Sequence, residues 1–253
     1  MAKLCLKNLI LWMAFAAFGP LGSLPCAAQP FFVGAVEDPE ILVSKAPSSS
    51  DSSRQNQEAT LVDIKAVDAP SLHTQNGKIG LASDERYGQG IIIDSSGIIA
   101  TNRHIIQNAN HIYVALSTGQ AFEATVLRTS QADLCLIKID TPTPLRAISL
   151  ADPSEIQIGS NVIAVANAGF NPQRIRGGQV IRIFKGKLSN NVELLETNIP
   201  LKPGDSGGPI LSKNGALLGL IMGKQISDPT KSYAIASSRI QQEYFKYRNS
   251  ILN

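Results

Sequence analysis

Short apolar runs between turn-forming residues are the feature of this sequence that most limits its possible folds. The chain has 253 residues, is 43% hydrophobic and contains 20 glycines, and its apolar runs end repeatedly at Gly, Pro, Asn or Ser. Runs of this length with such boundaries are typical of β-strands, whereas no long amphipathic pattern precedes the C-terminal region. The sequence therefore predicts an all-β fold with enough apolar residues for one or two buried cores.

Residues 204–209 (GDSGGP) suggest a chemical role for a serine. A serine hydroxyl needs a base to remove its proton and hydrogen-bond donors to hold the oxyanion that forms during attack on an acyl carbon. Gly204 can adopt backbone angles that let its N–H and that of Ser206 point into one concavity. The alternative interpretation is a surface turn, because Gly, Asp, Ser and Pro are the usual turn residues.

The order of the histidines narrows the choice of catalytic arrangement. The chain has three, His73, His104 and His111, and all precede Ser206. GDSGG also fits the G-x-S-x-G pattern of α/β-hydrolases, but those place their histidine after the serine. The remaining order is His, Asp, Ser. The spacing of the three histidines does not match a metal site.

His104 and Asp133 are the best partners for Ser206. His104 ends the stretch Gly90–His104, which contains a strand, a polar turn ending at Gly97 and a second apolar strand. Asp133 leads directly into the apolar run 134–139, where a half-buried carboxylate can accept the imidazole N–H and fix its tautomer. The other acidic candidates between His104 and Ser206 are Glu123, Asp140, Asp152, Glu155, Glu193 and Glu196.

Three segments together resemble the trypsin-like (chymotrypsin-fold) serine peptidases. They are residues 101–104 (TNRH), residues 132–134 (ADL) at the start of an apolar strand, and residues 204–209. Within that family the pattern is similar to the HtrA/Deg-like branch, whose members pair a G-x-G-x-I-I…G…T-N-x-H block with D-L-A-L-L-K-I and G-N-S-G-G-P. The resemblance covers about residues 85–245.

This resemblance implies two packed six-stranded antiparallel β-barrels with the site in the cleft between them. We expect the protease domain over residues 61–253, with barrels over about 61–150 and 151–236 and a C-terminal helix over about 237–248. The helix has independent support, because three apolar side chains follow one another at helical spacing. They are Ile240, Tyr244 and Tyr247.

The resemblance also implies a catalytic role for each matching residue. Ser206 would be the nucleophile, His104 the general base and then acid, and Asp133 its orienting partner, with the N–H groups of Gly204 and Ser206 as the oxyanion hole. Such an enzyme acts on protein or peptide substrates and needs no cofactor and no metal. A non-catalytic peptide-binding or chaperone-like module on the same fold is the alternative function.

The primary specificity pocket of this fold is lined by residues just before the nucleophile loop and by a strand after it. None of the side chains at these positions is charged, so we expect cleavage after small or medium apolar residues. The predicted lining residues are Ile199, Pro200, Leu201, Leu220, Ile221 and Met222.

Two departures from the HtrA/Deg-like pattern affect regulation. Residue 205 is Asp where that branch usually has Asn, and in digestive relatives this Asp pairs with a new N-terminus made by cleavage. The nearest imitation of such an N-terminus is Lys78-Ile79-Gly80, close to the first barrel strand. The residues after Pro209 are too few for a PDZ domain, so we do not expect peptide-gated activation through one.

The N-terminal region predicts export. Lys3 and Lys7 precede an apolar stretch, and small residues follow up to residue 28, as in a secretory signal peptide; an uncleaved membrane anchor is the alternative. Removing residues 1–28 takes away two lysines and no acidic residue. The formal net charge of +3 therefore does not indicate nucleic-acid binding. We expect a periplasmic or extracellular location.

The rest of the mature chain gives three smaller expectations. Residues 29–60 predict a flexible segment, in which residues 44–60 lack periodicity. Phe31-Phe32-Val33 is an apolar cluster, and N-terminal aromatics support trimers in HtrA-like proteins, so a trimer and a monomer both stay open. Cys135 is alone in the mature chain and predicts a small buried hydrophobe rather than a disulfide.

Overall fold

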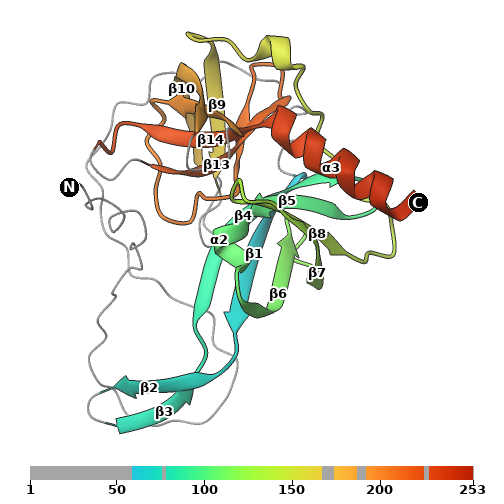
Figure 1. The fold of residues 1–253 in the computed structure, drawn as a ribbon, viewed down its shortest axis with the longest axis vertical. Coiled ribbons are helices and arrows are strands. Elements are labelled where there is room, and N and C mark those ends of the chain that lie inside the picture. Colours follow the sequence, from blue (N-terminus) through green and yellow to red (C-terminus); the bar gives the residue numbers. More distant parts are fainter. Residues whose placement is uncertain (1–58, 76–77, 167–173, 187–191, 225–227, 253) are drawn as a thin grey trace, which may run out of the picture. The chain divides into compact units, whose positions relative to one another are not determined.

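The computed structural model describes residues 59–75, 78–166, 174–186, 192–224 and 228–252 (Figure 1). The expected signal peptide and Phe31-Phe32-Val33 lie outside the described residues, as does nearly all of the expected linker. Thr60, at the end of that linker, is buried, and its carbonyl accepts a hydrogen bond from the Ile92 N–H at 2.9 Å. Among the described residues, Thr60 is thus already part of the packed first barrel.

Six antiparallel strands close the first barrel in the order β1-β4-β5-β8-β7-β6. A tight turn at Gly97, with φ of +95°, joins β4 to β5 as the sequence predicts. The strands are β1 (Leu61–Asp68), β4 (Glu85–Asp94), β5 (Ile98–Asn102), β6 (Ala109–Leu116), β7 (Ala121–Thr129) and β8 (Leu134–Ile139).

Six more antiparallel strands close the second barrel in the order β10-β11-β14-β13-β12-β9. A short 3-10 helix, η1 (Pro153–Glu155), lies between the two barrels in the sequence. The strands are β9 (Asn161–Ala166), β10 (Arg174–Gly186), β11 (Val192–Thr197), β12 (Pro209–Leu211), β13 (Leu217–Lys224) and β14 (Ser232–Ala236). Two closed six-stranded barrels confirm the predicted fold class.

Alternation along the strands divides the core into three clusters. On β8, Cys135 and Ile137 point into the first barrel, whereas Leu134 and Leu136 point the other way. This is the two-residue period of a strand that is buried on both faces. The outward-pointing side chains join Leu220 of β13 in a cluster shared by both barrels, while a third cluster fills the second barrel. The interface between the barrels is thus a hydrophobic core of its own.

The C-terminal helix α3 (Ser237–Leu252) packs through the predicted side chains. Ile240 is fully buried, and Tyr244 and Tyr247 pack against the shared cluster. The sequence predicts contact with the second barrel, and the structure adds contact with β7 and β8 of the first (Figure 1). The Tyr244 hydroxyl donates to Asp94, at the end of β4. The helix therefore connects the two barrels.

A separate two-stranded sheet precedes β4. It consists of β2 (Ser71–Gln75) and β3 (Lys78–Ala82), and His73 lies opposite Gly80 in it. Lys78-Ile79-Gly80, the nearest imitation of an activation sequence, is thus the start of β3. Of the helices that the structure describes, none is both long and apolar enough to span a membrane.

Cys135 is a buried thiol. Its exposed fraction is 0%, and burial raises the pKa of the thiol to about 11. A thiol with this pKa stays protonated near neutral pH and is a poor nucleophile. The expectation of a small buried hydrophobe is confirmed.

Candidate active site

His104 lies in a single helical turn, not at the end of a strand as the sequence suggests. The turn, α2 (Arg103–Ile106), follows β5 directly. Ile105 and Ile106 are 2% and 5% exposed and pack in the first barrel, so burial of these two side chains bends the chain inward after Asn102. The imidazole keeps an exposed fraction of 48%, which leaves it accessible to a substrate.

Asp133 is held against this turn by four hydrogen bonds. One carboxylate oxygen accepts the backbone N–H of His104 at 2.9 Å, and the other lies 2.7 Å from His104 Nδ1. The backbone carbonyl of Asp133 accepts from Arg103 N at 3.0 Å and from Asn102 Nδ2 at 3.2 Å. Asp133 has φ of +59°, in the left-handed region that Asp tolerates better than most residues. This backbone turn lets its carbonyl and carboxylate face the same segment.

The contact between Asp133 and His104 sets the state of the imidazole. An ionised carboxylate only accepts hydrogen bonds, so the proton of a neutral His104 resides on Nδ1. Nε2 then carries the lone pair and can accept a proton. The second bond, from the His104 backbone, fixes the carboxylate so that it cannot rotate away from the ring.

The Ser206 loop, residues 204–208, packs directly against β4 of the first barrel. The Gln89 N–H donates to the Ser206 carbonyl at 2.8 Å, and the Gly207 N–H donates to Ile221 of β13 at 2.9 Å. A Cβ at Gly207 would lie 1.9 Å from the Gln89 carbonyl oxygen, and its φ is +82°. Only glycine fits this position. The loop is therefore held between one strand of each barrel.

Gly88 brings the serine loop close to the histidine turn. A Cβ at this position would lie 2.4 Å from Cδ1 of Ile105 and 3.1 Å from the Ser206 carbonyl oxygen. Ser206 Oγ is 3.5 Å from the Met222 carbonyl oxygen, and none of the hydrogen bonds described joins it to His104. Long or unformed hydrogen bonds between nucleophile and base are common before a substrate binds.

The two backbone donors expected for an oxyanion hole have no partner within the described part of the chain. Gly204 has φ of +92°, as the expected oxyanion hole requires, and neither its N–H nor that of Ser206 takes part in a described hydrogen bond. By contrast, the N–H groups of Asp205, Gly207 and Gly208 all donate to backbone carbonyls. Donors that the loop leaves unused remain available to a bound anion.

Asp205 pairs with an arginine that sequence reasoning missed. Arg176 of β10 contacts Oδ2 of Asp205, and the backbone N–H of Lys202 donates to the same oxygen at 2.6 Å. The Asp205 side chain is 1% exposed and the Arg176 side chain 13% exposed. The two residues are separated by 29 positions, and nothing in the local pattern around Arg176 distinguishes it from the other arginines of β10.

The predicted specificity residues lie mostly in the cores. Four of them are at most 6% exposed and belong to hydrophobic clusters, namely Ile199, Leu201, Leu220 and Ile221. Pro200 is exposed, and its carbonyl accepts a hydrogen bond from Arg176 at 3.0 Å. Met222 is half-buried, with its carbonyl near Ser206. Pro200 and Met222 are thus the members of the set that a substrate can reach directly.

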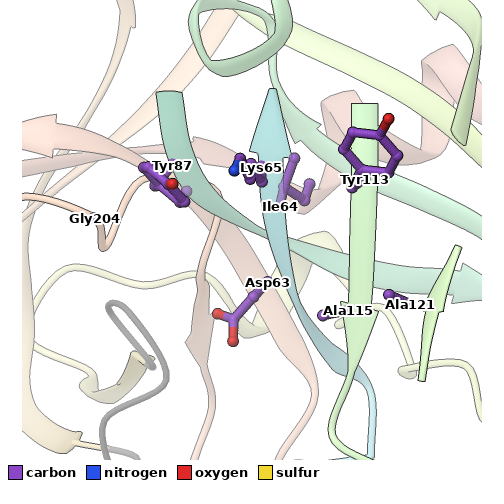
Figure 2. Close-up of a pocket in the computed structure, with 9 residues that line it drawn as sticks. Asp63, Ile64, Lys65, Tyr87, Tyr113, Ala115, Ala121 and Gly204 are labelled. Carbon is purple, nitrogen blue, oxygen red and sulfur yellow. The ribbon is translucent and has the colours of Figure 1, made fainter. Parts of the chain in front are cut away.

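An apolar groove of about 210 Å³ borders Gly204 on the outer face of the first barrel (Figure 2). It runs over β4, β1 and β6, and the exposed rings of Tyr87 and Tyr113 lie along it. Asp63 lies in the part of the groove shown below Lys65 in Figure 2. Burial raises the pKa of the Asp63 carboxyl to about 6.

The described residues contain no cluster of metal-ligating side chains. Their His, Cys, Asp and Glu side chains form no group of three that would hold a metal ion. His111, on β6, lies 2.7 Å from Glu123, and both side chains are exposed. The chemical groups that the structure brings near one another are therefore the His104 imidazole, the Asp133 carboxylate, the Ser206 hydroxyl and backbone N–H donors.

Two closed barrels with a histidine–aspartate pair on one and a serine loop on the other define the trypsin-like class of proteins. The family model described as "Trypsin-like peptidase domain" matches residues 88–220, about half of the chain. The chain belongs to this family, and the predicted resemblance is confirmed.

Curated relatives are serine proteases of the HtrA type. The chain is 34% identical over 137 residues to the periplasmic serine endoprotease DegP of Salmonella typhimurium, covering 53% of this chain and 29% of the relative. It is 32% identical over 165 residues to serine protease HTRA4 of Mus musculus, covering 61% of this chain and 33% of the relative. The chain thus spans about a third of the length of these relatives.

Solved structures show the same fold. An HtrA-type protease, AlgW S227A with a decapeptide, matches with a TM-score of 0.67 and 20% identity over 76% of this chain and 64% of that one. The serine endoprotease from Yersinia pestis matches with a TM-score of 0.62 and 23% identity over 80% of this chain and 68% of that one.

Proposed function

We propose that this chain is an exported serine endopeptidase of the HtrA type. The observation that carries the proposal is the pairing of Asp133 with Nδ1 of His104, at 2.7 Å, next to a serine loop with two unused N–H donors. Acyl transfer by a serine requires these three components together: base, orienting acid and oxyanion donors. The names of the relatives, which are serine endoproteases, support the same reaction.

The reaction proceeds in two acyl-transfer steps. Ser206 Oγ attacks the carbonyl carbon of the peptide bond while His104 Nε2 takes the hydroxyl proton, and the N–H groups of Gly204 and Ser206 hold the oxyanion. The imidazolium, stabilised by Asp133, then protonates the leaving amine as the C–N bond breaks. A water molecule attacks the resulting ester by the same route and restores Ser206. No metal or organic cofactor takes part in these steps.

The substrate class is protein or peptide, with cleavage after small or medium apolar residues. The predicted pocket residues carry no charge, whereas the exposed Lys202 adds a positive charge beside the loop and favours acidic side chains nearby. A peptide library scanned at the residue before the cleaved bond tests this preference. Preference for Lys or Arg at that position would contradict it.

Export to the periplasm or to the outside of the cell is part of the proposal. It rests on the signal-like N-terminal sequence, and the relatives named periplasmic endoproteases support it. N-terminal sequencing of the protein from its host tests this location, because a secreted chain would begin near Gln29. An unprocessed chain in the cytoplasm would contradict it.

Labelling with a fluorophosphonate tests the catalytic proposal directly. The reagent reacts with a serine only when base and oxyanion donors are in place. We expect the wild type to be labelled and Ser206→Ala and His104→Ala to remain unlabelled. Ser250→Ala, an exposed serine on α3, is the matched control and should label like the wild type.

A peptide-binding module without catalysis is the second candidate. The contact between Ser206 Oγ and the Met222 carbonyl, rather than with His104, is the observation that favours it. Such a module would bind peptides with the same affinity before and after Ser206→Ala. Failure of the wild type to label, together with peptide binding, would support this function instead.

A further inference from the structure

The buried ion pair of Asp205 and Arg176 lies directly beneath the predicted oxyanion hole. Asp205 stands between Gly204 and Ser206, the two residues whose N–H groups are unused. Its side chain points into the protein, where it is 1% exposed and meets the guanidinium of Arg176. The direction of this side chain fixes the peptide units on both sides of residue 205.

The pair cannot be separated without a large cost. Removing a carboxylate from water costs several kcal/mol, so a buried carboxylate that has lost its cation is strongly destabilised. Among the ion pairs of the described residues, Arg176 is the cation that Asp205 contacts. The other carboxylate oxygen, Oδ1, is buried without a hydrogen-bond partner in the described part of the chain. Asp205 therefore stays in this position because of Arg176 and the N–H of Lys202.

Arg176 is itself held by rigid structure. It lies on β10, directly opposite Ala164 of β9 in the second barrel. Besides contacting Asp205, it donates to the Pro200 carbonyl at 3.0 Å, at the start of the segment that leads into the loop. One guanidinium thus links a barrel strand to the segment before the loop and to the loop itself. A guanidinium carries a positive charge at all physiological pH values.

We propose that Arg176 is a positioning residue that holds Asp205, and through it the N–H groups of Gly204 and Ser206, in the geometry that binds an oxyanion. The site is then ready without cleavage of the chain, because the cation that Asp205 requires is already present inside the fold. Lys78-Ile79-Gly80 does not supply it, since this segment is the start of β3 and pairs with β2. This inference rests on the proposed peptidase function and specifies how its site is assembled.

Replacement of Arg176 tests the proposal through the kinetics of peptide hydrolysis. Loss of oxyanion donors lowers kcat far more than it raises KM, and we expect Arg176→Ala to lower kcat/KM by about 100-fold or more. Arg176→Lys keeps the charge but not the planar fork and should retain intermediate activity. Arg182→Ala is the matched control, since Arg182 lies on the same strand and its loss also leaves a buried carboxylate, that of Glu196, without its cation, but outside the Ser206 loop. It should hydrolyse the peptide like the wild type.

The pH profile and the intact mass separate positioning from a general structural effect. An α-amino group would lose its charge above about pH 8, so a wild type that depends on Arg176 keeps its kcat/KM from pH 8 to about pH 10. The mass of the active protein should show no cut between residues 59 and 88. Activity that appears only after such a cut would overturn the proposal.

The outcomes also distinguish this inference from the function on which it rests. A wild type that fluorophosphonate does not label contradicts the peptidase function itself. If the wild type is labelled, and Arg176→Ala is also labelled and hydrolyses the peptide at the same rate as the wild type, only the role of Arg176 is overturned. If Arg176→Ala does not fold, Arg176→Lys is the deciding variant. A Lys variant whose kcat/KM equals that of the wild type, and whose kcat stays constant from pH 8 to 10, would contradict the requirement for the guanidinium fork.

Discussion

The two halves of the candidate active site are held by different kinds of interaction. In the first barrel, four hydrogen bonds connect Asp133 to the segment from Asn102 to His104, over two adjacent strand ends. In the second barrel, the Ser206 loop depends on a buried ion pair and on a glycine that allows close contact with β4. The first half is a feature of the pairing between β5 and β8, whereas the second depends on the contacts of a single buried side chain and on one close backbone approach between the barrels.

This difference predicts how each half fails. Loss of one hydrogen bond in the first half leaves the others in place, so the imidazole loses its correct tautomer while the fold persists. Loss of a partner in the second half leaves a buried charge or a clash, and the loop must move as a whole. Mutations in the first half should therefore affect chemistry, and mutations in the second should affect loop structure as well.

Asp133→Asn is expected to have the largest effect on activity. The amide can donate to Nδ1 and thereby favour the wrong tautomer of His104, so we expect kcat to fall by about ten-thousand-fold. Asp140→Asn, at the far end of β8 with a side chain that is 98% exposed, is the control and should have no effect. The measurement is peptide hydrolysis, with the unfolding midpoint as a check on the fold. Activity within tenfold of the wild type would show that Asp133 does not orient the imidazole.

Gly207→Ala tests the close contact in the second half. The new Cβ would clash with the Gln89 carbonyl at φ of +82°, so we expect a loss of about 3 kcal/mol or more in the free energy of unfolding. Gly119→Ala is a matched control, since Gly119 has φ of +84° and no atom within 4 Å of the new Cβ. Backbone strain alone should lower the free energy of unfolding of Gly119→Ala by about 1 kcal/mol.

Chemical denaturation of both glycine variants gives the comparison. The difference between their free energies of unfolding measures the cost of the contact with β4, because both share the same backbone strain. Equal losses would mean that the loop moves away from β4 without cost, and the contrast between the two halves would not hold.

Glu243→Gln tests the helix that connects the two barrels. The Glu243 side chain is 3% exposed and meets Arg128 of β7 at 2.5 Å and Arg239 at 2.7 Å. Burial by itself would raise the pKa of Glu243, but the hydrogen bonds from Arg128 and Lys246 outweigh it and leave the pKa below its usual value. We expect Glu243→Gln to lower the free energy of unfolding by about 2 kcal/mol at pH 7.

The same variant has a defined pH dependence. A carboxyl whose pKa is lowered on folding stabilises the protein above its unfolded pKa, and this stability is lost as pH falls through the folded pKa. The difference between wild type and Glu243→Gln should therefore shrink below about pH 4.5. A difference that stays constant down to pH 3 would show that the charge of Glu243 contributes nothing.

Asp63→Asn should have the smallest effect on the free energy of unfolding, and at neutral pH it should raise that free energy rather than lower it. Burial raises the pKa of Asp63 to about 6, so its protonated form fits the fold better than its charged form. The contribution of Asp63 to stability is present at low pH and declines as pH rises from about 4 to about 6. Denaturation of wild type and variant at pH 4, 5, 6 and 7 checks this: the two should be similar at pH 4, and the variant should be the more stable at pH 7. A gap between the two that does not widen with pH would contradict it.

Much of the first half of the site was predictable from local sequence. Gly97 ends one strand and begins another, and Asp133 directly precedes a run that could only be a buried strand. Pairing of β5 with β8 then places Asp133 beside the end of β5, where His104 follows. The helical turn at His104 was not predictable, because it arises from burial of Ile105 and Ile106 in a barrel that the local sequence does not describe.

The support of the second half was not predictable. The glycines beside Ser206 have a local reason, which is their positive φ, and the sequence indicates it. No local pattern identifies the partner of Asp205, because β10 carries several arginines and only closure of the barrel decides which one faces the loop. The packing of α3 on both barrels likewise depends on where the first barrel lies.

The sequence by itself determined the strands, because alternation and turn residues act over a few neighbouring positions, and it fixed the order of His104, Asp133 and Ser206. Its resemblance to a known family then implied the barrel class. Only the tertiary structure decided that Arg176 meets Asp205 and that Gly207 meets Gln89. The strength of these contacts depends on burial, which exists only once both barrels have closed.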